Sequence, residues 1–252
     1  MNDNDIEKYR GFLKCPLKKE WNGSETDRKK GLPAPNYQKP YPENAPLIKL
    51  LAVEDFSIGK LPLIDVMAKR KSRRTYTGES LTLPEISFLL WATQGMRKIT
   101  RIKGQPSNKR TVPSGGGIHP FETYLLVNRI EGIDAGLYRY LPLDHLLCFL
   151  FRDKSLNQEI HEACFHQHVL NSAATFIWTV TPYRAEWRYG KFCHKILAID
   201  AGHVCQNLYL ACEAINIGVC AIGAYDQEQL DALIDLDGKD EFTIYAASVG
   251  KV

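Results

Sequence analysis

The sequence predicts a layered α/β or α+β domain, because stretches typical of strands alternate with stretches typical of helices from about residue 62 onward. Residues 174–181 (ATFIWTVT) are rich in β-branched and aromatic side chains, as buried strands are. Residues 193–217 are apolar nearly all round, which is typical of a core helix or a subunit contact. The 252 residues are 44% hydrophobic and 24% charged, the balance of an ordinary globular protein.

Charge and hydropathy exclude several classes of protein. A net charge of +3 is too small to indicate nucleic-acid binding, and no apolar run approaches the roughly 18–20 residues of a membrane helix. The polar N-terminus is not a signal peptide. The seven cysteines never form a CxxC pair, and the histidines around Cys164 fit no metal-site spacing. We therefore expect reduced, mostly buried thiols in a cytoplasmic protein, with no metal.

The chain divides into an arm, residues 1–60, and a main domain, residues 61–252. The arm has intermixed charges and many prolines, so we expect it to lie extended over a surface without a core of its own. In the main domain, Thr82 and Glu85 have the capping-box spacing of a helix start, and Gly95 is a suitable stop. Further helices are expected at 155–165, 193–217 and 227–234. Strands are expected at 122–128, 174–181 and 242–250. A hairpin is expected at 136–150, and an extended segment or strand at 219–225. The basic stretch 97–111 is predicted to be a loop.

The first candidate site is the basic run at residues 69–74. Arg70, Ser72 and Arg74 follow the spacing Arg-x-Ser-x-Arg, and two guanidinium groups with a hydroxyl can converge on one phosphate. The alternative is a solvated basic run before a turn.

The second candidate site is the glycine-rich stretch TVPSGGGIHP, residues 111–120. Its glycines allow the backbone to approach a flat or anionic ligand and leave N–H groups free to donate. It is neither a Walker loop nor a Rossmann fingerprint. The alternative is a flexible turn.

The third candidate is Trp187-Arg188-Tyr189-Gly190, in which an aromatic ring, a fixed cation and a phenol could stack on a substrate and donate to it. The alternative is an ordinary loop with a partly buried arginine. His203, within the long apolar helix, is expected to be a satisfied core histidine.

The order of these motifs resembles the nitroreductase superfamily, and within it the SagB-type (McbC-like, ThcOx-like) FMN-dependent dehydrogenases. The resemblance covers roughly residues 65–252 and depends most on PSGGGIHPFE and AGHVCQNLYL. It implies a three-layer α/β/α fold with a central, mostly antiparallel sheet, and an interlocked homodimer that binds FMN between its subunits.

The resemblance also assigns residues to the FMN site. Arg70, Ser72 and Arg74 match the positions that hold the FMN phosphate, and Lys251 matches a basic residue that often joins them. Two segments match the positions along the isoalloxazine ring, one on each edge: Pro113, Ser114, Gly115 and Gly116, and Ala221, Ile222 and Gly223. In the family, a backbone N–H of the second segment donates to flavin N5, where hydride arrives or leaves.

Arg188 and Tyr189 match a catalytic pair, with one departure. Relatives that oxidise azoline rings carry Lys-Tyr where this chain has Arg-Tyr. Arginine stays charged in proteins and cannot serve as a base, so Tyr189 is the titratable member of the pair.

Three functions follow as hypotheses. The first is an FMN-dependent oxidoreductase that transfers hydride through N5, acting on a peptide azoline or a related substrate. The second is an NAD(P)H-dependent reductase of small nitro compounds, quinones or flavins. The third is a flavin-binding docking subunit of a peptide-modifying complex. We expect no nucleic-acid partner and no membrane.

Overall fold

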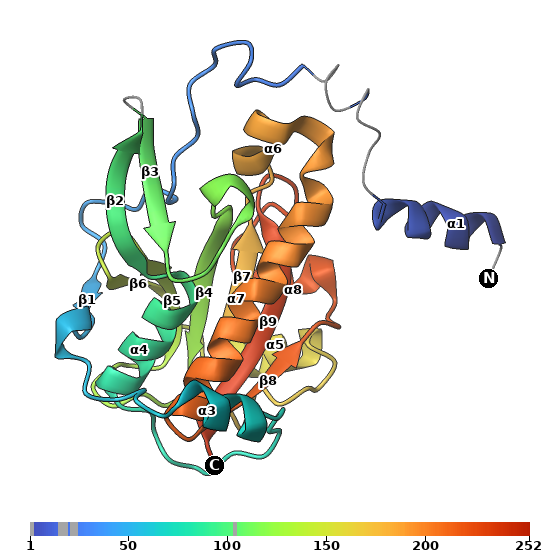
Figure 1. The fold of residues 1–252 in the computed structure, drawn as a ribbon. Coiled ribbons are helices and arrows are strands. Elements are labelled where there is room, and N and C mark those ends of the chain that lie inside the picture. The colour runs from blue at the N-terminus through green and yellow to red at the C-terminus, as the bar shows by residue number, and fades with distance from the viewer. Residues whose placement is uncertain (1–2, 15–19, 21–24, 103–104) are drawn as a thin grey trace.

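The computed structural model describes residues 3–14, 20, 25–102 and 105–252 (Figure 1). The helices are α1 (Asp3–Phe12), α3 (Leu63–Lys69), α4 (Leu83–Gln94), α5 (Leu156–Ala163), α6 (Tyr183–Tyr189), α7 (His194–Ala214) and α8 (Gln227–Leu233). The strands are β1 (Leu47–Lys49), β2 (Met96–Ile102), β3 (Gln105–Arg110), β4 (Phe121–Val127), β5 (Gly136–Leu141), β6 (Leu146–Phe151), β7 (Ala174–Val180), β8 (Ile217–Ile222) and β9 (Phe242–Lys251). Short 3₁₀ turns lie at η1 (Val53–Asp55), η2 (Gly115–Gly117) and η3 (Gly190–Phe192).

A seven-stranded sheet in the order β1-β6-β5-β4-β7-β9-β8 forms the centre of the molecule. Each pair of neighbouring strands in it runs antiparallel. All residues of β4 and β7 are buried, as expected of strands that are covered on both faces. The central antiparallel sheet that the resemblance implies is confirmed.

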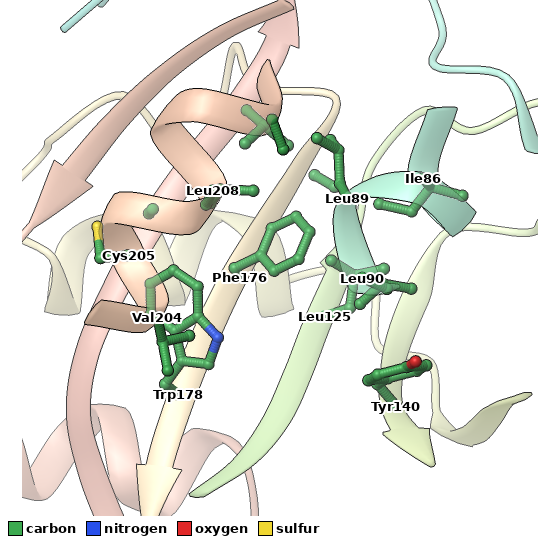
Figure 2. Close-up of a cluster of buried hydrophobic side chains, with 14 of the residues drawn as sticks. Ile86, Leu89, Leu90, Leu125, Tyr140, Phe176, Trp178, Val204, Cys205 and Leu208 are labelled. Carbon is green, nitrogen blue, oxygen red and sulfur yellow. The ribbon is translucent and has the colours of Figure 1, made fainter. Parts of the chain in front are cut away.

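Helices cover both faces of the sheet, so the three-layer architecture is also confirmed. Successive residues of a strand point to opposite faces, and in β4 Leu125 packs in one core cluster and Leu126 in the other. The first cluster lies between the sheet and helices α4 and α7. In it, Phe176 and Trp178 of β7 pack with Val204 and Leu208 of α7 and with Leu89 and Leu90 of α4 (Figure 2). The second lies between the sheet and helices α5 and α8.

Helix α4 begins and ends as the sequence predicts. The Thr82 hydroxyl accepts from the Glu85 backbone N–H, and the Glu85 carboxylate accepts from the Thr82 N–H at 2.8 Å, which completes a capping box. At the other end the Gly95 N–H donates to the Trp91 carbonyl, 2.8 Å away.

The prediction of a loop at residues 97–111 is wrong. Strands β2 and β3 pair there as an antiparallel hairpin, with Pro106 opposite Arg101 in the register. Pairing of backbone groups does not require an apolar side-chain pattern, so a basic composition does not prevent a two-stranded ribbon.

The region before residue 61 contains regular structure that the sequence analysis does not predict. Besides α1, it contributes β1 to the edge of the main sheet, where Ile48 lies opposite Leu147 of β6. Leu50, only 3% exposed, is part of the first core cluster. A strand of three residues is too short to show a periodic pattern in the sequence.

The six cysteines in the described residues are buried and free, as the sequence predicts. Burial raises the pKa of each of these thiols, which makes them poor nucleophiles. Within the described ranges, no helix combines the length and the apolar character needed to cross a membrane.

Candidate functional site

The segment that follows α3 carries the three residues predicted to bind phosphate. The Ser72 hydroxyl lies 2.8 Å from the Tyr209 hydroxyl of α7, and the Arg70 guanidinium lies over the Tyr209 ring, 5.4 Å from its centre. Arg74 lies beside the Cys220 thiol of β8, whose pKa is raised by burial and lowered in part by the Arg74 charge. The structure therefore places Arg70 and Ser72 together at Tyr209, with Arg74 beside the neighbouring strand.

Arg73, within the same basic run, has a different role. Its backbone N–H donates to the Val219 carbonyl at 3.0 Å, and its guanidinium forms a two-point ion pair with the buried Glu213 carboxylate. Hydrogen bonding to Arg73 lowers the pKa of Glu213. By contrast, Arg70 and Arg74 take part in no ion pair within the described ranges. Their charges are therefore available to an anion.

Tyr209 is a site residue that the sequence analysis did not select. Its hydroxyl accepts a hydrogen bond from the Ala221 N–H at 3.0 Å, so it connects Ser72 to strand β8. Ile222 is buried at the end of β8, and Gly223 is exposed immediately after it. Tyr209 lies within the motif AGHVCQNLYL, which was the signal that could have identified it.

Lys251, at the end of β9, forms an ion pair with Glu85. The other carboxylate oxygen of Glu85 accepts from the Thr82 N–H. In this chain Lys251 therefore ties the last strand to the start of α4, a contact that the sequence analysis did not predict.

The glycine-rich loop is anchored on α7 by Asp200. One carboxylate oxygen of this buried residue accepts from the Ser114 hydroxyl at 2.7 Å and from the Gly115 N–H at 2.8 Å. Ser114 Oγ also accepts from the N–H of His119, whose pKa is lowered to about 3 by burial and by the charge of Arg110. His119 is therefore neutral at ordinary pH. Pro113, at the start of the loop, is exposed.

Arg188 and Tyr189, at the end of α6, lie against this loop. Arg188 Nη1 donates to the Gly116 carbonyl at 2.8 Å, and its guanidinium lies over the Tyr189 ring, 5.2 Å from the centre. Gly116 has φ +66°, and a Cβ there would collide with the Tyr189 hydroxyl and lie 2.9 Å from Arg188 Nη1. Only glycine allows this approach. The structure thus joins the second and third candidate sites into one.

The two groups of candidate residues lie at different points along α7. Tyr209 marks the first and Asp200 the second, and nine helical residues at about 1.5 Å each separate them by about 14 Å. Figure 1 shows α3 beside the C-terminal part of α7 and α6 beside its N-terminal part.

The prediction that His203 is a core histidine is wrong, because its side chain is 46% exposed and lies with Ile199, 48% exposed, on the outer face of α7.

One group of possible metal ligands occurs in the described residues, and the sequence analysis did not predict it. Glu186, Cys193 and His194 have ligand atoms within 4.8 Å of one another. His194 Nε2 is 2.8 Å from a Glu186 oxygen and Nδ1 is 3.0 Å from the Lys191 carbonyl, so both ring nitrogens already have protein partners.

Comparison with models of protein families identifies the class of this chain. Residues 67–251 match the model of the nitroreductase family, and the chain belongs to that family. A Methanocaldococcus jannaschii protein provisionally described as a nitroreductase is 29% identical over 195 residues, which cover 77% of this chain and 93% of that protein. The trifolitoxin-processing protein of Rhizobium leguminosarum bv. trifolii is 28% identical over 134 residues, 51% of this chain and 36% of that protein.

Solved structures show the same fold. A nitroreductase-like protein from Anabaena variabilis superposes with a TM-score of 0.66 at 28% identity, over 83% of this chain and 42% of that one, so this chain spans less than half of that protein. A chain of the Escherichia coli microcin synthetase McbBCD complex, solved with truncated pro-MccB17 bound, superposes with a TM-score of 0.61 at 16% identity, over 100% of this chain and 94% of that one. The chain is therefore a member of the nitroreductase family of oxidoreductases and has the nitroreductase fold.

Proposed function

We propose that this protein is an FMN-dependent oxidoreductase of the SagB type, which transfers hydride through flavin N5. The observation that carries the proposal is the contrast within one basic run. Glu213 neutralises Arg73, whereas Arg70 and Arg74 form no ion pair in the described part of the chain. Two uncompensated guanidinium groups with the Ser72 hydroxyl between them suit a phosphate monoester.

The glycine-rich loop suits a flat ring. A Cβ at Gly117, which has φ +67°, would meet no atom within 4 Å, so the backbone there is open to close approach. Ser114 and Gly115 are fixed by Asp200, which keeps the loop in one conformation. The bound flavin would supply hydride-transfer chemistry, and this chain would supply its binding and orientation.

The donor to flavin N5 would come from the end of β8. The Ala221 N–H already donates to Tyr209, and the Ile222 N–H faces Ala246 of β9 in the antiparallel ladder, so the Gly223 N–H is the better candidate for this role. Tyr209 would fix the position of both parts of the site, because its hydroxyl is hydrogen-bonded to Ser72 and to the Ala221 N–H.

We propose a homodimer in which each FMN is bound by both chains. Tyr209, which contacts Arg70 and Ser72, and Asp200, which holds the glycine-rich loop, lie about 14 Å apart along α7. In the proposed dimer, the two copies would contribute these two sets of residues to each FMN site. Helix α3 exposes Leu63, Ile64 and Met67 by 60%, 77% and 60%, and α7 exposes Ile199. Such apolar faces are typical of subunit contacts.

The substrate can be a peptide azoline or a small molecule reduced with NAD(P)H. Similarity to the trifolitoxin-processing protein supports the first, and similarity to the archaeal nitroreductase-like protein supports the second. Arg188 at the position of the usual lysine also supports the second, because it removes a base from peptide oxidation.

Titration of the apoprotein with FMN tests the cofactor assignment. Arg74→Ala removes one charge-assisted contact, which at about 1.5–3 kcal/mol should weaken FMN binding roughly 10- to 150-fold. The matched control is Lys71→Ala, which removes an equal charge from an exposed neighbour. Equal FMN affinity in both variants would refute the phosphate assignment.

A further inference from the structure

The corner between α6 and α7 brings together three side chains of types that bind transition metals. Glu186 lies on α6, Cys193 lies just before α7, and His194 is the first residue of α7. Gly190, with φ +55°, makes the turn between them: its N–H donates to the Glu186 carbonyl and closes α6, and its carbonyl accepts from the Cys193 N–H at 3.3 Å. The carboxylate, the thiol and the imidazole thereby come within 4.8 Å of one another.

The His194 ring is held as metal-binding histidines usually are. Nδ1 lies 3.0 Å from the Lys191 carbonyl, which can only accept, so Nδ1 carries a proton. Nε2 lies 2.8 Å from a Glu186 carboxylate oxygen, which is also an acceptor. In a neutral ring the Nε2 lone pair faces the carboxylate, so the two groups require a cation between them, either a proton or a metal ion. A histidine that donates from one ring nitrogen to a backbone carbonyl and presents the other nitrogen to a metal is the usual arrangement.

The donor set selects the class of metal. An imidazole nitrogen, a thiolate sulfur and a carboxylate oxygen together suit Zn²⁺, whereas Mg²⁺ and Ca²⁺ prefer oxygen ligands alone. A thiolate and a carboxylate also balance the charge of a divalent ion, which matters because Cys193 is fully buried. Burial and the charge of Glu186 raise the pKa of the Cys193 thiol to about 11, so binding of the ion would displace the thiol proton to the solvent.

The geometry is close to that of a bound site and open to the solvent. Two ligands at about 2.0–2.1 Å from a tetrahedral ion lie about 3.3 Å apart, so Glu186 and His194 need to separate by only about 0.5 Å. Their side chains are 36% and 46% exposed, which gives an ion a path from the solvent. Water can take the fourth position, as it does where a protein supplies three ligands.

We propose that Glu186, Cys193 and His194 form a binding site for a Zn²⁺ ion. None of the three is among the residues assigned to FMN, so the inference does not depend on the proposed function. A bound ion would tie the end of α6, which carries Arg188 and Tyr189, to the start of α7. The site would therefore stabilise the position of these two residues without contacting the substrate.

Titration of the reduced, full-length protein with Co²⁺ and then with Zn²⁺ tests the site. Co²⁺ is a spectroscopic substitute for Zn²⁺, and its tetrahedral thiolate complexes absorb at longer wavelengths than flavin, so the protein can be used with or without FMN. We expect one Co²⁺ per chain and its displacement by Zn²⁺. Cys193→Ala should abolish the cobalt bands and weaken Zn²⁺ binding at least about tenfold. The matched control is Cys148→Ala, which removes another buried thiol on β6 and should leave both unchanged.

Absence of Co²⁺ and Zn²⁺ binding by the wild-type protein would overturn the inference. Binding that Cys193→Ala leaves unchanged would also overturn it, because the ion would then be bound elsewhere. His194→Gln and Glu186→Gln leave the buried thiol in place and keep the test decisive if Cys193→Ala does not fold. Each should weaken Zn²⁺ binding at least about tenfold, and unchanged affinity in both would refute the site.

Hydrogen exchange tests the connection between the two helices. Zn²⁺ should slow exchange at residues 186–194 in the wild-type protein and have no such effect in His194→Gln. If Zn²⁺ slows exchange equally in both proteins, the protection does not come from this site and the inference fails.

Discussion

The Arg73–Glu213 ion pair gives a quantitative prediction that separates structural from ligand-binding arginines. The two side chains are 21% and 5% exposed, and they share two hydrogen bonds. Arg73→Ala leaves the Glu213 carboxylate buried without its partner, which typically costs about 3–5 kcal/mol. Because water reaches part of Arg73, we expect about 2–4 kcal/mol here. At about 2–4 °C per kcal/mol for a chain of this size, Tm should fall by roughly 5–15 °C.

The same ion pair should give a defined pH dependence. Arg73 lowers the pKa of Glu213, so its stabilising effect is present above the ordinary glutamate pKa and is lost as the pH falls through the lowered value. The Tm difference between wild type and Arg73→Ala should therefore be full at neutral pH and shrink below about pH 4.

Calorimetry of the apoprotein, together with FMN titration, is the assay. Arg73→Ala should lose stability and keep its FMN affinity, whereas Arg74→Ala should lose FMN affinity and keep its stability. If Arg73→Ala melts within about 2 °C of wild type at neutral pH, the buried pair does not stabilise the fold as argued. If it loses FMN as strongly as Arg74→Ala, the division of roles within the basic run is wrong.

Three further predictions concern the joined loop and helix. Tyr189→Phe should slow turnover by about 100-fold, the lower end of general acid–base effects, with FMN content unchanged, and full turnover would remove Tyr189 from the chemistry. Gly116→Ala should cost about 1–2 kcal/mol from φ +66° alone and also displace the Tyr189 hydroxyl, so a normal Tm and normal turnover would contradict the observed approach. Trp187→Phe removes the hydrogen bond to Leu32 and should speed hydrogen exchange in α6; unchanged exchange would show that the segment around Leu32 does not hold the helix.

Much of the fold could be predicted because its signals are local. The capping box at Thr82 and Glu85 lies within one turn, and the buried strand at residues 174–181 shows in its composition. The hairpin of β2 and β3 was missed because it depends on backbone pairing and not on an apolar pattern. Strand β1 was missed because three residues carry too little pattern.

The candidate site was predictable in its parts but not in its connections. Motifs placed Ser72 and Ser114, yet their hydrogen-bond partners Tyr209 and Asp200 lie 137 and 86 residues away along the chain. Such contacts follow from packing α7 against both segments, which no local pattern encodes. The exposed position of His203 likewise depends on which face of α7 the sheet covers. The resemblance to a family supplied the order of the motifs, and the structure supplied which of them meet.

The visible spectrum of the purified, FMN-reconstituted protein, recorded anaerobically before and after addition of NADPH and NADH, tests the central claim most directly. The account predicts a bound flavin band in the wild-type protein, at one FMN per chain. Rapid bleaching by a nicotinamide nucleotide would identify a reductase of small molecules, and a band that stays oxidised would identify a dehydrogenase that takes electrons from its own substrate. A protein that binds no flavin at all would contradict the account.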